Sequence, residues 1–162
     1  MKVLDQLLQI KEFREDKAQA EVSRARGALT EADSALTRAK THLDEHRADC
    51  DLRERQIYAD LCTRQVRLTD LQDVALKVDE FKQSIQGCES RVNEATEHRV
   101  AKADCLTQSQ QLHQSAVRVR QKFSELCEMS SADELLEQSR AEDAELEEVP
   151  TKLVRHDEEE VS

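Results

Sequence analysis

Apolar residues recur along the chain at alternating steps of three and four positions. A repeat of this kind keeps one narrow apolar stripe on one side of an α-helix, where it faces a partner helix. Ile57 continues the stripe after a polar interruption at Arg53. The pattern predicts a long helix with a thin coiled-coil seam. The first series consists of Val22, Ala25, Leu29, Ala32, Leu36, Ala39, Leu43, His46 and Cys50.

A second series follows after an interval and predicts a second long helix. It weakens over residues 96–113 and recovers around Ala116, Val119, Phe123 and Leu126. The seam is therefore expected to be weak or shifted in the middle of this helix. The clear part of the series consists of Leu71, Val74, Val78, Phe81, Ile85, Cys88, Val92 and Ala95.

Between the two series, residues 67–70 are predicted to turn the chain. Thr69 can cap a new helix, and Gln72, three residues on, can complete a capping box. An antiparallel register that pairs Cys50 with Cys88 is centred on residue 69, in agreement with this turn.

The pattern thus predicts an all-α fold, a long antiparallel two-helix coiled-coil hairpin over residues 1–129. Its helices span 2–66 and 70–129, each about 90 Å long at 1.5 Å per residue. The same heptads can instead form a parallel homodimer of longer helices, because no proline forces a turn near residue 69. We favour the hairpin, as a monomer in isolation.

Beyond the hairpin, Ser130 and Ser131 carry overlapping capping signals, which predict a short C-terminal helix over 130–147. Pro150 is expected to end that helix, and 148–162 is expected to form a flexible acidic tail.

Composition narrows the function classes. Ala, Glu, Lys, Leu and Arg make up about half of the 162 residues, as in coiled coils, and only two Gly and one Pro are present. Sheet folds need more turn residues than this. With 2% aromatic residues the chain cannot build a thick core around an enzyme pocket. No apolar run approaches the roughly 20 residues that span a bilayer.

Charge is concentrated at the C-terminal end. The net charge is −11, and residues 133–162 account for most of it, with 12 acidic and 3 basic side chains. Nucleic acid would repel this segment and would find no aromatic platforms for its bases. We therefore expect no nucleic-acid partner and no insertion into a membrane.

One string has a catalytic appearance. His42, Glu45 and His46 match the HxxEH pattern of a metallopeptidase class, but a two-helix hairpin offers neither a third ligand nor a cavity. We predict no catalytic residue, no metal, no cofactor and no enzyme activity. Cys50 and Cys88 are interpreted as small apolar seam residues, with a redox switch as the alternative.

Both ends of the hairpin carry more apolar residues than a two-helix seam requires. At the turn, Leu68, Leu71 and Val74 stand among charged residues. The dense apolar set near the start consists of Val3, Leu4, Leu7, Leu8, Ile10 and Phe13. Apolar surface beyond a seam is typical of docking sites, although local packing would also explain it.

The spaced pattern Leu4-x-x-Leu7-Leu8-x-Ile10-Lys11-x-x-Arg14-Glu15-x-Lys17-Ala18, with the later Lys122-Phe123, resembles the YscO family of type III secretion stalk proteins, whose flagellar counterpart is FliJ. The resemblance implies a cytosolic stalk that links a hexameric secretion ATPase to the export-gate protein and, in some members, binds secretion chaperones. The alternative is a generic cytosolic coiled-coil adaptor or chaperone-like clamp.

By this resemblance, each end of the hairpin has one partner. The candidate contacts with the ATPase are Leu4, Leu8, Ile10, Lys11, Arg14 and Phe123. The candidate contacts with the export gate are Arg64, Arg67, Leu68, Leu71, Asp73, Val74 and Val78.

Overall fold

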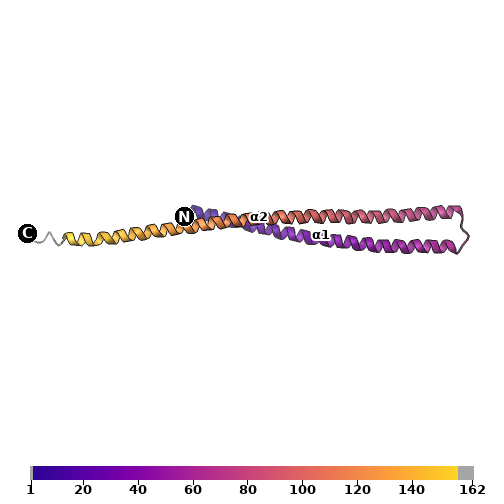
Figure 1. Cartoon of the computed structure of the whole chain (residues 1–162), viewed down its shortest axis with the longest axis horizontal. Helices are drawn as coiled ribbons and strands as arrows, with labels where there is room; N and C mark the ends of the chain where they lie inside the picture. The colour runs from indigo at the N-terminus through magenta and orange to yellow at the C-terminus, as the bar shows by residue number, and fades with distance from the viewer. Residues whose placement is uncertain (1, 157–162) are drawn as a thin grey trace, which may run out of the picture. The chain divides into compact units, whose positions relative to one another are not determined.

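The computed structural model describes the backbone of residues 2–156 and the side chains of residues 3–147. That part of the chain contains two long helices, which pack against each other, and no strand. Helix α1 spans Lys2–Cys62, helix α2 spans Leu68–His156, and residues 63–67 join them (Figure 1). The predicted all-α, two-helix architecture is confirmed.

The helices contribute to two compact units. The first, here called the terminal unit, contains residues 2–19 of α1 and the described part of α2 from 112 onward. The second, the loop unit, contains residues 20–111 and therefore the connection between the helices. In each unit a segment of α1 packs against a segment of α2.

The core is a thin seam, as the heptad pattern predicts. Among the described residues the buried apolar side chains are few and mostly small, and Leu43 is the largest of them. Each falls on one of the two predicted series, because only the seam stripe of each helix is covered by the other helix. The buried set consists of Val22, Ala32, Leu43, Cys50 and Cys88.

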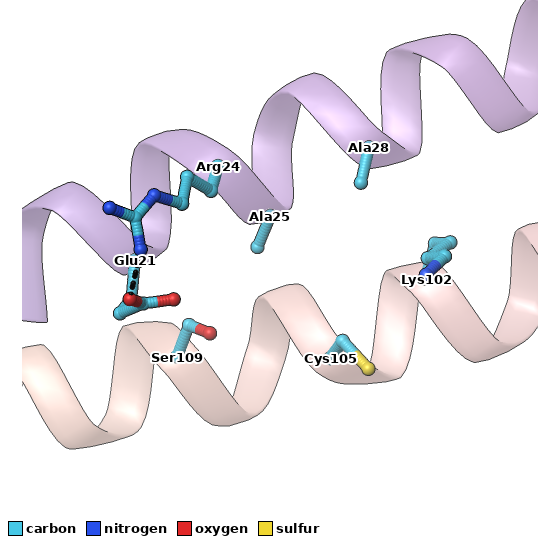
Figure 2. A pocket seen from close by; sticks show the side chains of 7 residues that line it. All are labelled: Glu21, Arg24, Ala25, Ala28, Lys102, Cys105 and Ser109. Carbon is cyan, nitrogen blue, oxygen red and sulfur yellow. Dashed lines mark hydrogen bonds and ion pairs between the residues drawn. The ribbon is translucent and has the colours of Figure 1, made fainter.

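Small side chains leave a shallow groove in one part of the loop unit. Ala25 and Ala28 of α1 point toward α2, where Cys105 and Ser109 lie opposite (Figure 2). The groove falls in the weak part of the second series, because such short side chains cannot fill the space between two helix backbones.

The start of α2 differs from the predicted turn. The Asp70 carboxylate accepts a hydrogen bond from the Arg67 backbone N–H at 2.9 Å, and the Arg67 carbonyl accepts one from the Leu71 N–H. Arg67 is therefore the N-cap, and Asp70 supplies the side chain that reaches back to it. The prediction that Thr69 caps the helix is wrong. Thr69 lies inside the first turn of α2.

The register within the loop unit is shifted accordingly. His42 Nδ1 lies 3.7 Å from Cys88 Sγ, His46 Nε2 is hydrogen-bonded to Ser84 Oγ, and Arg47 pairs with Glu89. The midpoint of each contacting pair along the sequence falls between residues 65 and 68. The predicted centre at residue 69 is therefore wrong, since the connection lies at 63–67.

At the C-terminal end, the predicted break at 130 and the separate helix over 130–147 are wrong. Helix α2 continues without interruption and passes Pro150 to end at His156. The Ser131 hydroxyl donates a hydrogen bond to the Cys127 carbonyl at 2.9 Å, so it is bonded within the helix and does not cap a new one. The backbone of 148–156 is helical, and the rest of the predicted tail, 157–162, lies outside the described residues.

Candidate functional site

The first candidate surface lies on α1 in the terminal unit. Val3, Leu7, Ile10 and Phe13 are exposed there, and the Val3 and Phe13 side chains retain 68% and 69% of their accessible area. Their spacing of four, three and three residues places them along one side of the helix. Together they form an apolar strip outside the seam, which we call the terminal surface.

The residues predicted to contact the ATPase divide between this surface and the seam. Ile10 and Arg14 are exposed, as a contact with a partner requires. Leu4 and Leu8 are half-buried, because they occupy seam-facing positions.

Lys11 and Phe123 contact each other within the terminal unit. The Lys11 ammonium lies 5.0 Å from the centre of the Phe123 ring, within the range of a cation–π interaction. One turn further along α1, the Glu15 carboxylate accepts a hydrogen bond at 2.7 Å from Arg120 Nε. Both contacts hold α1 against α2, so these side chains position the terminal surface.

The second candidate surface surrounds the connection between the helices. Leu68 and Leu71 are exposed in the first turn of α2, with 73% of the Leu68 area accessible. Arg64, Arg67 and Asp73 are also exposed. We call this set the loop surface. The predicted contacts Val74 and Val78 are half-buried and belong to the seam.

A groove adjoins the loop surface. It combines apolar walls with charges of both signs, and Arg64 and Asp73 are shared with the surface itself. The groove therefore offers both apolar area and polar groups that would fix the orientation of a docked segment. The residues that line the groove are Ile57, Asp60, Leu61, Arg64, Asp70, Asp73, Val74 and Lys77.

The seam of the loop unit contains a cluster of sulfur and imidazole groups. Cys50 Sγ lies 3.6 Å from His46 Nε2, and the His42 and His46 rings are stacked with centroids 6.1 Å apart. Cys88 approaches His42 from α2. Polar residues within a coiled-coil seam favour one register of the two helices over others.

Burial lowers the reactivity of the Cys50 thiol. Burial raises the pKa of the Cys50 thiol, and the neighbouring Asp49 carboxylate raises it further. The reactive thiolate is therefore scarce at neutral pH. Among the described residues, no group of three or more His, Cys, Asp or Glu side chains is placed to hold a metal ion.

The difference in exposure between Cys50 and Cys62 predicts selective alkylation. We expect iodoacetamide at neutral pH to modify the exposed Cys62 at least roughly tenfold faster than Cys50, because thiolate and access are both limited at Cys50. Peptide mass spectrometry over time measures the two rates. In guanidinium the rates should converge, and similar rates in the folded protein would contradict the burial of Cys50.

The family model for the type III secretion protein YscO matches residues 4–152. The chain belongs to the YscO family. A crystal structure of the type III secretion protein YscO from Vibrio parahaemolyticus has the same fold. Its TM-score is 0.83 and its sequence identity 23%, over 90% of this chain and 92% of that one. Among curated proteins, none matches the chain significantly.

Membership of the YscO family confirms the resemblance drawn from the sequence pattern and makes this a type III secretion protein. Within the described residues, neither helix has a stretch long and apolar enough to cross a membrane.

Sequence reasoning missed several exposed apolar residues of both units. Leu112 and Met129 lie on α2 in the terminal unit, and Val66 and Leu76 lie near the loop surface. Their spacing relative to the seam could have revealed Leu112 and Met129, because both fall one position before a seam residue of α2.

Proposed function

We propose that this YscO family member is a cytoplasmic stalk without catalytic activity of its own, which couples a hexameric secretion ATPase to the export gate. The observation that carries the proposal is the pair of exposed apolar surfaces on a two-helix protein of this family, one in each unit. Coupling of this kind needs two docking surfaces and a stiff connection, and it needs no active site.

The terminal surface is assigned to the ATPase. Val3, Leu7, Ile10 and Phe13 offer an apolar strip, and Arg14 adds a positive charge beside it. An exposed strip of this type on a helix suits a hydrophobic groove or ring lining on a partner.

The loop surface is assigned to the export gate. Leu68 and Leu71 supply apolar area, while Arg64, Arg67 and Asp73 supply charges that select a partner. A secretion chaperone is a further candidate partner, and the same family membership supports it.

The assignment of the terminal surface is tested with the purified secretion ATPase of the same host. We expect the chain to bind this ATPase and to raise its rate of ATP hydrolysis. The double substitution Ile10→Asp and Phe13→Asp should weaken binding at least roughly tenfold, since two apolar anchors are replaced by charges that must be desolvated.

The matched control is Leu52→Asp, which places the same charge on an exposed leucine of the loop unit outside both surfaces. It should leave binding unchanged. Helicity and melting temperature, followed by circular dichroism, verify that the variants fold. Full binding by the double variant would overturn the assignment of the terminal surface to the ATPase.

A further inference from the structure

The C-terminal part of α2 extends past the start of α1 within the terminal unit. Lys11 meets Phe123 and Glu15 meets Arg120, so the antiparallel run of the helices brings Lys2 near residue 132 of α2. Every residue from 135 to 147 is exposed. We call residues 133–147 the acidic arm, because it contains seven acidic side chains and one basic side chain.

The preceding stretch of α2 has the opposite charge. Residues 105–124 contain no Asp or Glu at all, while Arg118, Arg120 and Lys122 are positive. Helix α2 therefore carries a basic segment and an acidic segment in succession. Two such helices are complementary to each other when they run antiparallel.

A stripe on the outer side of α2 has the spacing that such pairing requires. Its residues follow one another at steps of three and four. As far as Asp133, each lies one position before a half-buried residue that faces α1, so the stripe is rotated by about 100° around the helix from the seam. Leu112, Leu126, Met129 and Leu136 retain between 49% and 69% of their area, so the prediction that Leu126 lies in the seam is wrong. Val119 is the one half-buried member of the stripe. The stripe consists of Leu112, Ser115, Val119, Lys122, Leu126, Met129, Asp133, Leu136, Arg140 and Asp143.

The inner part of the stripe, from Val119 to Leu136, is complementary to itself about its midpoint. If a second α2 runs antiparallel with Leu126 opposite Met129, then Lys122 faces Asp133 and Val119 faces Leu136. Two apolar layers and one ion pair follow from a single register, and each layer occurs twice by symmetry. Because the spacing of three and four residues is the same on both sides of the midpoint, fixing one of these layers fixes the others.

A groove beside the stripe fits the acidic arm of the second copy. Leu112, Ser115 and Val119 line this groove together with Lys11 and Arg14 of α1. The register above places residues 136–143 of the second copy there. That segment contains three acidic residues and one basic residue, Arg140, so its net negative charge complements the two basic side chains of α1.

We propose that the chain associates with a second copy of itself through an antiparallel pairing of α2 helices, centred between Leu126 and Met129. Each copy lays its acidic arm on the basic segment of the other. This association goes beyond the monomer expected from the sequence, and it does not depend on the proposed contacts with the ATPase or the export gate.

Charge reversal tests the pairing. Sedimentation at low ionic strength should show a dimer with twice the 18.6 kDa mass of one chain, and added salt should weaken it. Lys122→Glu alone and Asp133→Lys alone should each weaken association at least roughly tenfold, because each places like charges opposite one another. The double variant K122E/D133K should restore it.

The controls separate pairing from folding and from other arrangements. Both residues are exposed, so each variant should keep the helicity and melting temperature of the parent. Lys40→Glu, a reversal on exposed α1 surface in the loop unit, should leave the dimer unchanged. In a parallel pairing each residue faces the same residue of the second copy. Like charges then face one another before and after a single reversal, so single reversals would have no effect. That result, a failure of the double variant to restore association, or a monomer at about 0.1 mM would overturn the proposal.

Discussion

Leu43→Asp is expected to unfold the loop unit at moderate temperature. Leu43 is the largest apolar side chain that is buried in the described part of the chain, and it retains only 8% of its accessible area. Truncating a buried leucine costs about 2–5 kcal/mol, and a carboxylate in the same place adds the cost of desolvating a charge. A loss of about 3 kcal/mol lowers the melting temperature of a chain of this size by roughly 10 °C. Thermal unfolding followed by circular dichroism measures the shift.

Leu76→Asp is the matched control for that loss. Leu76 lies in the same unit, on α2, but it is exposed over most of its surface. Surface substitutions of this kind usually change stability by less than about 0.5 kcal/mol. If the Leu43 and Leu76 variants melted at the same temperature, the two-helix seam would not be the source of stability in the loop unit.

The seam could be predicted because it depends on a periodic property. Val22, Ala32, Leu43 and Cys50 are buried as the heptad requires, since any two helices with such stripes minimise exposed apolar area by packing the stripes together. Helix ends depend instead on single hydrogen bonds. At the start of α2, the Asp70 side chain accepts the hydrogen bond from Arg67, so the helix begins before Thr69. The Ser131 hydroxyl, a predicted cap, instead bonds to a carbonyl within the helix.

The candidate surfaces could be located from the sequence only by segment. A dense apolar segment indicates that some residues lie outside the seam, but the helix phase decides which ones. The sequence groups Leu4 and Leu8 with Val3 and Phe13 in one dense apolar segment. In the structure Leu4 and Leu8 are half-buried at the seam, while Val3 and Phe13 are exposed. A rotation of about 100° per residue turns a neighbour in the sequence to a different side of the helix.

Substitution of the loop surface should stop secretion while the ATPase contact persists. We expect the double variant Leu68→Asp and Leu71→Asp to lose secretion of type III substrates by at least roughly tenfold in the native host, because both exposed leucines of the proposed gate contact become charged. Binding to the secretion ATPase should remain at the parental level, since these residues lie in the loop unit and the proposed ATPase contact lies in the terminal unit.

The position of these leucines keeps this test independent of folding. Leu68 and Leu71 lie in the first turn of α2, where acidic side chains interact favourably with the helix dipole by about 0.3–1 kcal/mol. This gain offsets the repulsion from the neighbouring Asp70, so the variant should stay close to the parent in stability, which thermal unfolding verifies. Leu52→Asp should secrete normally. Loss of both secretion and ATPase binding would contradict separate docking surfaces, and normal secretion by the double variant would remove the loop surface from the coupling mechanism.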